Sequence, residues 1–276
     1  MKTSSTLGKV YLVGAGPGAA DLITVRGAKL LEKADIVFHD ALVEPEMLEL
    51  CKQAVKVPVG KRCGKLSSAQ HFINKRLVDA AQQYKIIVRL KGGDPMLFGR
   101  ADEEIQALKN AGIVVEVVPG ITAALAGAAS IQQSLTLRGI SRSVAFITLA
   151  QATESGNSEQ TQPMSNPSAD TLVYYMGRKD AAKIAQQLIE KSPDKTSNTP
   201  VQILEAVSTP RERHWSSTLG ELALGKADSW FESSSPALIM VGQALQNTSL
   251  NLERSSSKID NGLQDSLLLT HGQRRA

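Results

Sequence analysis

Three glycine-bearing turns in the first half of the chain have residue types that suit ligand binding. They are Val10-Tyr-Leu-Val-Gly-Ala-Gly-Pro-Gly18, Lys91-Gly-Gly-Asp-Pro95 with Phe98-Gly-Arg100 and the acidic pair Glu103-Glu104, and Val118-Pro-Gly-Ile-Thr-Ala123. Glycine permits tight turns and lets a ligand approach the bare backbone, whose N–H groups bind anions. Each turn follows an apolar run typical of a strand. Because the carboxyl ends of parallel strands form the ligand-binding rim of an open α/β sheet, we expect one shared pocket.

The first turn also fits a dinucleotide-binding pattern, and this leaves an NAD-dependent dehydrogenase as an alternative. Gly14-x-Gly16-x-x-Ala19 is followed by Asp40 at about the 20-residue distance of that pattern. Two features argue against it. Pro17 removes a backbone donor that a pyrophosphate would need, and the next helical pattern begins near Thr24 rather than at Gly18.

The elements that must position these turns follow from the hydrophobic pattern. Short apolar runs alternate with helical patterns through residues 1–150, which predicts an N-terminal α/β domain. We expect strands at Val10–Val13, Ile36–Phe38, Ile86–Leu90, Ile113–Val118 and Val144–Thr148, and helices at Thr24–Lys33, Ser67–Gln83, Ala101–Asn110 and Ile121–Ile131.

The rest of the chain divides into three parts. Residues 151–169 are rich in Ser, Gln, Asn and Thr, and we interpret them as a polar linker or loop. Residues 170–246 resume the alternation of strands and helices, which predicts a second, smaller α/β domain. Residues 247–276 are polar and Ser-rich, as is typical of a disordered tail.

The motifs together resemble those of the uroporphyrinogen-III C-methyltransferases, in order and spacing, over about residues 8–245. Besides the glycine turns, the resemblance rests on Asp40-Ala-Leu-Val43, Val59-Gly-Lys-Arg62, Leu135-Thr136, Tyr175-Met-Gly177 and Ser235-Pro-Ala-Leu-Ile239. It implies the tetrapyrrole methylase fold, in which the active-site cleft lies between two α/β domains. It also implies that the protein is a homodimer.

The implied reaction transfers methyl groups from S-adenosylmethionine to C2 and C7 of uroporphyrinogen III. The product is precorrin-2, formed through precorrin-1, for sirohaem or cobalamin synthesis. No segment of dehydrogenase and ferrochelatase type precedes the matched region, so we expect the reaction to stop at precorrin-2. A methylase of the same fold acting on a later corrin intermediate is the alternative.

The resemblance also implies roles for individual residues. Asp40 would be the general base and Lys61 the proton donor, because the methylated macrocycle must lose and relocate a proton. Methyl transfer itself mainly needs alignment and exclusion of water. The implied cofactor contacts are Pro17, Gly92, Gly93, Asp94, Leu97, Thr122, Ala123, Met176 and Val207, and no metal is expected.

The chain departs from the family pattern at four places. The arginine that commonly follows the motif's aspartate is Ala41, and the usual histidine of Leu-Thr-His-Arg is Leu137. A Thr-Gly-His after the fifth strand ends here in Ala150. The Glu-Asn-Gly-Thr turn is Glu205-Ala-Val-Ser208, which leaves the cofactor contact at Val207 open.

The net charge of +4 is unevenly distributed. Residues 1–150 hold 19 Lys and Arg against 13 Asp and Glu, and 14 of these basic residues fall between Lys52 and Arg142. Such an excess attracts polyanions. Uroporphyrinogen III carries eight carboxylates, which guanidinium groups bind bidentately. The candidate substrate contacts are therefore Arg62, Arg100, Arg138 and Arg142.

The composition argues against several other classes of protein. Aromatic residues make up 4% of the chain, and no stacking motif or reading helix accompanies the basic residues, which disfavours a nucleic-acid-binding module. Cys51 and Cys63 are too few for a disulfide scaffold or a zinc site. Since no apolar run approaches the length of a membrane span and Met1–Lys9 is polar, we expect a cytoplasmic enzyme without a membrane anchor.

Overall fold

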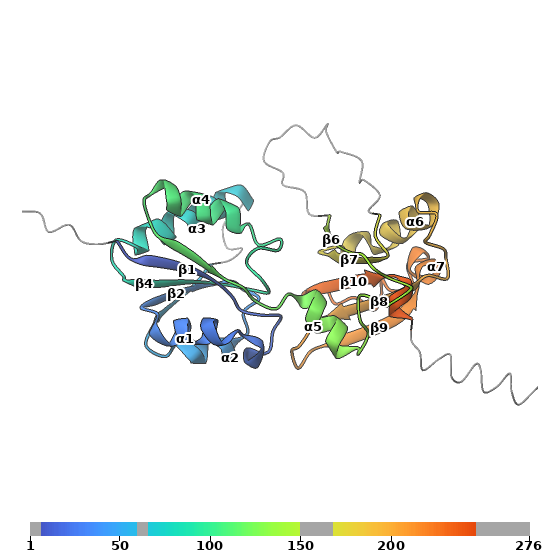
Figure 1. Cartoon of the computed structure of the whole chain (residues 1–276), viewed down its shortest axis with the longest axis horizontal. Coiled ribbons are helices and arrows are strands. Elements are labelled where there is room, and N and C mark those ends of the chain that lie inside the picture. Colours follow the sequence, from blue (N-terminus) through green and yellow to red (C-terminus); the bar gives the residue numbers. More distant parts are fainter. Residues whose placement is uncertain (1–6, 60–65, 150–167, 247–276) are drawn as a thin grey trace, which may run out of the picture.

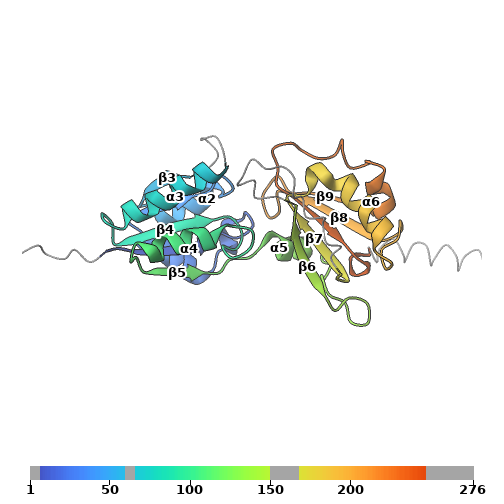
Figure 2. The same ribbon diagram turned by 90° about the horizontal axis from the view of Figure 1, so that it is seen from above.

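The computed structural model describes residues 7–59, 66–149 and 168–246. These residues form two α/β units, each built on a five-stranded sheet (Figures 1 and 2). The predicted fold class, α/β with two domains, is confirmed. Residues 150–167, which make up most of the predicted linker, and the predicted tail 247–276 lie outside the described residues.

The first sheet is parallel throughout and has the strand order β3-β2-β4-β1-β5. Dinucleotide-binding sheets place their first two strands side by side. Here β4 lies between them, so the topology speaks against the dehydrogenase alternative. The strands are β1 (Lys9–Gly14), β2 (Ile36–His39), β3 (Val55–Pro58), β4 (Ile86–Lys91) and β5 (Val115–Val118).

Helices cover both faces of this sheet (Figure 1). Val88 and Leu90 of β4 pack with Leu31 of α1 on one face, whereas Ile87 packs with Leu77 of α3 on the other. None of the described helices is long and apolar enough to cross a membrane. The helices are α1 (Val25–Lys33) and α2 (Pro45–Leu48) on the first face, and α3 (Leu66–Ala80) and α4 (Ala101–Asn110) on the second.

The second sheet is mixed and has the order β6-β7-β10-β8-β9. β6 and β7 are parallel, and the other neighbouring strands are antiparallel. Helices α6 (Ala181–Lys191) and α7 (Leu219–Ala223) cover one face and α5 (Ala123–Ser130) the other. The strands are β6 (Val144–Thr148), β7 (Thr171–Tyr175), β8 (Pro200–Glu205), β9 (Arg213–Thr218) and β10 (Ala237–Val241).

The boundary between the two units lies earlier than the predicted position after residue 150. β6 pairs with β7, from Val144 opposite Thr171 to Thr148 opposite Tyr175, and therefore belongs to the second sheet. Helix α5 also packs on that sheet. The first sheet ends with β5 at Val118, and the short Pro-Gly segment after it leads into the second unit.

Candidate active site

The three glycine turns meet at the carboxyl ends of β1, β4 and β5. The N–H of Gly93 donates to the carbonyl of Gly16 at 2.7 Å, and the N–H of Gly16 donates back at 3.2 Å. A Cβ atom on Gly120 would lie 2.2 Å from the carbonyl oxygen of Gly93, and one on Gly14 would lie 2.5 Å from the Cα of Gly120. Backbone therefore packs directly against backbone, and only glycine fits at positions 14 and 120.

This packing removes the phosphate-binding geometry that the first turn would need in a dehydrogenase. The N–H of Gly16 is already bonded to Gly93, and the first α-helix after β1 starts only at Val25. Pyrophosphate sites need free N–H groups at the start of a helix that follows the glycines directly.

Asp94 joins the second turn to the third. Its Oδ2 accepts a hydrogen bond from the N–H of Gly120 at 2.8 Å, and its Oδ1 accepts one from the N–H of Met96 at 2.8 Å. Both carboxylate oxygens are therefore used within the protein. Asp94 was predicted as a cofactor contact, and in this structure its carboxylate shapes the two turns.

The second unit meets these turns through strand ends with unusual backbone. Met176 follows β7 with φ 56°, and Ala206 and Ser208 follow β8 with φ 50° and 60°. The N–H of Ala19 donates to Ser208 Oγ at 3.1 Å, and a Cβ on Gly18 would lie 2.9 Å from the carbonyl oxygen of Val207. Left-handed backbone at non-glycine residues is uncommon and tends to gather at functional sites. Val207 thus lies where the two units meet, and Pro17 is next in sequence to Gly18 of this contact.

Tyr175 connects the two units, although sequence reasoning gave it no role. Its hydroxyl lies 2.6 Å from Thr122 Oγ1 and accepts a hydrogen bond from the N–H of Ala124 at 3.1 Å. Its ring packs edge-on against Phe98 at 5.2 Å between centroids. Burial raises the pKa of Tyr175 above its usual value. The only available signal was its place directly before Met176 in the quoted motif.

Asp40 lies at the same rim, directly after β2. Its N–H donates to the carbonyl of Leu90 at 3.3 Å, and its Oδ1 accepts a hydrogen bond from Arg89 Nη2 at 2.5 Å. The Asp40 side chain is 30% exposed, whereas that of Arg89 is 3% exposed. A Cβ on Gly92 would lie 3.3 Å from the Cβ of Leu42, so the turn after Asp40 packs against the second glycine turn. The structure therefore brings the predicted base together with Gly92 and Gly93.

Beneath Asp40 lies a cluster of buried charges that sequence reasoning missed. Glu104 Oε1 accepts hydrogen bonds from Arg89 Nε, Lys91 Nζ and Gln70 Nε2 at 3.1, 3.1 and 3.2 Å. Burial lowers the pKa of Lys91, and the nearby Arg89 lowers it further. Burial opposes the charge of Arg89, but Glu104 and Asp40 outweigh this effect and raise its pKa. The sequence signal for this cluster was the pair Arg89-x-Lys91, two basic residues that lie on the same face of a central strand.

The three predicted substrate arginines that the structure describes, Arg100, Arg138 and Arg142, are not brought together. Arg100 follows the second turn and its Nε donates to Glu103 Oε1 at 2.6 Å. Arg142 lies before β6 and its N–H donates to Asp170 Oδ2, at the end of β6 and β7 opposite to Met176. Arg138 lies in the turn closed by Leu137 and Ser141, which precedes Arg142. Since a strand rises about 3.3 Å per residue, Arg142 lies more than about 13 Å along β6 from the end that pairs with Tyr175. The contact of Arg138 and Arg142 with substrate stays a prediction.

Two further predicted residues, Lys61 and Arg62, lie outside the described residues, as does Ala150. Within the residues that the structure describes, no group of three His, Cys, Asp or Glu side chains is placed to hold a metal ion.

Comparison with known proteins decides the family. The sequence pattern of the Tetrapyrrole (Corrin/Porphyrin) Methylases matches residues 9–223. The chain belongs to this family. The predicted enzyme class, an S-adenosylmethionine-dependent methyltransferase, is thereby confirmed.

This tetrapyrrole methylase is similar to several proteins whose names are more specific. A siroheme synthase of Zymomonas mobilis is 43% identical over 263 residues, which cover 94% of this chain but 53% of that protein. The chain thus spans about half the length of the curated relatives it matches. The crystal structure of a uroporphyrin-III C-methyl transferase from Thermus thermophilus, complexed with S-adenosyl homocysteine, is 36% identical, with a TM-score of 0.73 over 87% of this chain and 94% of that one. A cobalt precorrin-4 methyltransferase is 26% identical, with a TM-score of 0.69 over 87% of this chain and 96% of that one.

The glycine turns of this methylase fit the methyl donor of the family. Gly93 has φ 69°, and a Cβ placed on it would find its nearest neighbour only at 4.0 Å, at the Cα of Thr122, so there is space beside its Cα. Leu97 lies four residues after Gly93, and Ala123 directly follows Thr122; both are half-buried. Met176, in the second unit, is exposed. Backbone groups beside apolar side chains suit a nucleoside that carries a short amino-acid chain.

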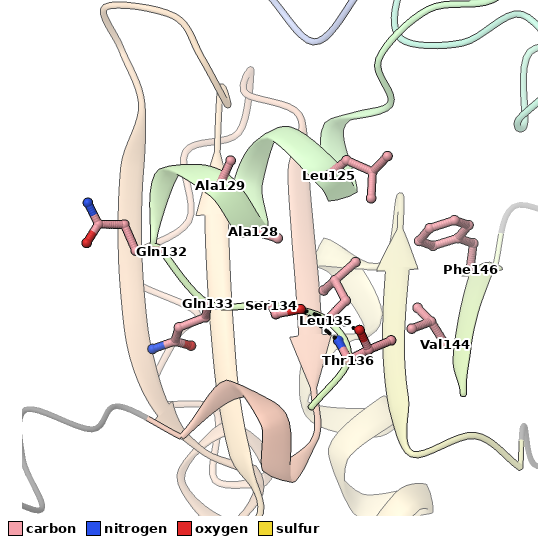
Figure 3. Close-up of a pocket in the computed structure, with 10 residues that line it drawn as sticks. All are labelled: Leu125, Ala128, Ala129, Gln132, Gln133, Ser134, Leu135, Thr136, Val144 and Phe146. Carbon is pink, nitrogen blue, oxygen red and sulfur yellow. Dashed lines mark hydrogen bonds between the residues drawn. The ribbon is translucent and has the colours of Figure 1, made fainter. Parts of the chain in front are cut away.

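The methylase also has an apolar hollow of about 460 Å³ on its second unit. It lies between α5 and the edge strand β6 (Figure 3). Leu125 and Phe146 lie on opposite sides of its upper part, and both are exposed. Its main apolar lining residues are Leu125, Ala128, Ala129, Leu135, Val144 and Phe146.

Proposed function

We propose that this chain is a uroporphyrinogen-III C-methyltransferase, which transfers methyl groups from S-adenosylmethionine to C2 and C7 of uroporphyrinogen III and yields precorrin-2 through precorrin-1. The observation that carries the proposal is the position of Asp40. Its carboxylate lies at the rim of the glycine turns, anchored on one oxygen and partly exposed. The similarity to the Thermus thermophilus methyl transfer enzyme over nearly its full length supports the same reaction.

The chain's own residues bind and orient the two reactants. The backbone at Gly92, Gly93 and Thr122 lines the site of the methyl donor, with Leu97 and Met176 closing over it. S-adenosylmethionine supplies an electrophilic methyl group. Pro17, Ala123 and Val207 complete the wall at the contact between the units and help to exclude water.

Asp40 acts as the general base after the new carbon–carbon bond has formed. The ring carbon gains the methyl group as the sulfur–methyl bond breaks, and the macrocycle then loses a proton to the Asp40 carboxylate. A base with one oxygen fixed and the other accessible is suited to this step. We assign the complementary donation of a proton to Lys61, on its position in the family motif.

The substrate carboxylates are held by Arg62 and Arg100. The Arg100 side chain is about one-third exposed, and Glu103 orients its guanidinium. The exposed apolar side chains of Leu42, Phe98 and Met176 offer a surface to the face of the macrocycle. The site thus combines apolar contact with peripheral cations, as an octacarboxylate ring requires.

We also propose that the enzyme is a cytoplasmic homodimer. The exposed apolar hollow between α5 and β6 supports contact with a second copy, because an edge strand beside an apolar groove can pair with the same face of an identical chain. A chain with only two cysteines suits a reducing compartment.

The test is anaerobic incubation of the protein with S-adenosylmethionine and uroporphyrinogen III, followed by mass and absorption analysis. We expect two added methyl groups. Cobalt-precorrin-4 is offered in a parallel reaction, because the similarity to the cobalt precorrin-4 methyltransferase makes a later corrin intermediate the second candidate. If only cobalt-precorrin-4 is methylated, uroporphyrinogen III is not the substrate.

The proposed base is tested with Asp40→Asn. We expect turnover to fall by about 100-fold or more, within the range for loss of a general base, while S-adenosylhomocysteine still binds. Asp102→Asn, which changes an exposed carboxylate on α4, is the matched control and should keep full activity. Full turnover by Asp40→Asn would remove Asp40 from this role.

A further inference from the structure

The central strand β4 carries two cations in the interior of the first unit. Arg89 and Lys91 are 2% and 3% exposed, on a strand with a neighbour on each side and helices over both faces of the sheet. Such strands are normally continuous apolar runs, since a buried charge is costly. A pair of charges at this position therefore needs a reason.

Arg89 is held on three sides and points one donor at Asp40. Its Nε donates to Glu104 Oε1 at 3.1 Å and its Nη1 to the carbonyl of Leu90 at 3.1 Å. Its Nη2 donates to Asp40 Oδ1 at 2.5 Å. A guanidinium fixed at Nε and Nη1 cannot rotate without losing both bonds, because its donors form a rigid planar fork.

Glu104 supports Arg89 from helix α4. It is fully buried, and Lys91 Nζ donates to both of its oxygens at 3.1 Å, so that its charge is compensated by two cations. Gln70 of α3 adds a further hydrogen bond to Oε1. The chain of contacts thus runs from helices α3 and α4 through the sheet to Asp40 at the rim.

We propose that Arg89 is the positioning residue for Asp40, and that Glu104 and Lys91 hold Arg89 in the orientation that leaves Asp40 Oδ2 for the substrate. The proposal rests on the role of Asp40 in the proposed function. Arg89 does not itself touch the reactants. Among the described residues, none donates to Asp40 Oδ2. Oδ1 therefore anchors the carboxylate to Arg89, and Oδ2 is the oxygen that takes the proton from the substrate.

Four charged or titratable groups lie near Asp40. They are Arg89 and Lys91 from β4, Glu104 from α4, and His39 from β2, whose Nδ1 lies 3.3 Å from the Asp40 carbonyl oxygen. Arg89 is the cation in direct contact with the Asp40 carboxylate, so its removal releases the carboxylate from the orientation that this contact fixes.

Two variants separate charge from orientation. Arg89→Met removes both, and we expect kcat to fall at least about tenfold, as for displaced reacting groups, while S-adenosylhomocysteine still binds. Arg89→Lys keeps a buried cation beside Glu104, but a single ammonium cannot replace the fork. We therefore expect Arg89→Lys to lower kcat at least about tenfold as well.

The matched control is Lys195→Met. Lys195 is a buried cation of the second unit, 5% exposed, and it donates to the Ala169 carbonyl at 3.1 Å. Its loss should lower stability and leave kcat nearly unchanged. If Arg89→Met and Lys195→Met lower kcat equally, Arg89 has only a structural role and the proposal is overturned.

A second measurement does not depend on turnover. Protein labelled with ¹³C-aspartate is examined by NMR, with Asp40→Asn used to assign the Asp40 carboxylate signal, and S-adenosylhomocysteine binding is measured alongside. We expect the Asp40 signal to move or broaden in Arg89→Met but not in Lys195→Met, with cofactor affinity close to that of the parent. An Asp40 signal that is unchanged in Arg89→Met refutes the role of Arg89, whereas a parent enzyme that fails to methylate uroporphyrinogen III refutes the proposed function and leaves this measurement intact.

Discussion

The hydroxyl of Tyr175, at the end of β7, lies 2.6 Å from the hydroxyl of Thr122, which precedes helix α5. The same phenol oxygen accepts a hydrogen bond from the N–H of Ala124, whereas Thr122 makes no side-chain cap of its own. A strand end of the second sheet therefore completes the first turn of the helix that follows the first sheet. Because Phe98 packs on the Tyr175 ring, the same residue also fixes the edge of the second glycine turn.

Replacing this phenol by a phenyl ring should destabilise the protein. Tyr175→Phe leaves the N–H of Ala124 without its partner, and we expect the free energy of unfolding to fall by about 1–2 kcal/mol. The free energy of unfolding of both proteins is measured by urea denaturation. S-adenosylhomocysteine binding should weaken as well, since Thr122 is a proposed cofactor contact. Unchanged stability together with unchanged affinity would show that the contact contributes nothing.

The neighbouring Tyr174 provides the opposite case. Its hydroxyl is buried and has no hydrogen-bond partner among the described residues. An unsatisfied buried hydroxyl is unfavourable, so Tyr174→Phe should leave the free energy of unfolding unchanged or raise it by up to about 1 kcal/mol. A loss of stability equal to that of Tyr175→Phe would contradict this interpretation.

Tyr174 also predicts how stability depends on alkaline pH. Burial raises the pKa of Tyr174 to about 12, from about 10 in the unfolded chain. The folded state therefore keeps a proton that the unfolded state loses, and stability that is fully present below about pH 10 declines as the pH rises toward about 12. Denaturation at several pH values should show a shallower decline in Tyr174→Phe than in the parent protein.

Asp94 should matter more for cofactor binding than for chemistry. Asp94→Asn replaces one of two accepting oxygens by a donor, so the N–H of Gly120 or of Met96 loses its partner. Hydrogen bonds to charged groups contribute about 1.5–3 kcal/mol, and we expect the Kd for S-adenosylhomocysteine to rise at least about tenfold by calorimetry. Asp102→Asn is again the control. An unchanged Kd would mean that the two turns keep their relation without the Asp94 carboxylate.

The sequence allowed the buried strands and the glycine turns to be predicted, because both have local signals. β3 and β9 could not be predicted in this way, because neither is an uninterrupted apolar run and most of their side chains are at least partly exposed. The partner of β6 was misjudged because an apolar run indicates a strand without indicating which sheet it joins.

The charge pattern was partly misread for a similar reason. Arg89 and Lys91 counted toward the basic excess that was interpreted as a receptor for a polyanion, yet both are buried and bonded to Glu104. Composition records the sign of a charge but not its burial. Arg138 and Arg142 are exposed, and the register of β6 with β7 places Arg142 at the end of β6 opposite to Tyr175.

The apolar hollow between α5 and β6 is the expected contact between two copies of the chain. Leu125 is 55% exposed on α5 and lines this hollow opposite Phe146. In a homodimer that buries this face, Leu125→Glu places a charge in an apolar contact without a partner, so light scattering after gel filtration should find the mass of a monomer. Leu224→Glu, at a residue 77% exposed after α7, makes the same change away from the hollow and should leave the dimer intact. A dimer that survives Leu125→Glu would show that the two copies meet elsewhere, and a parent protein that runs as a monomer would remove the proposed homodimer.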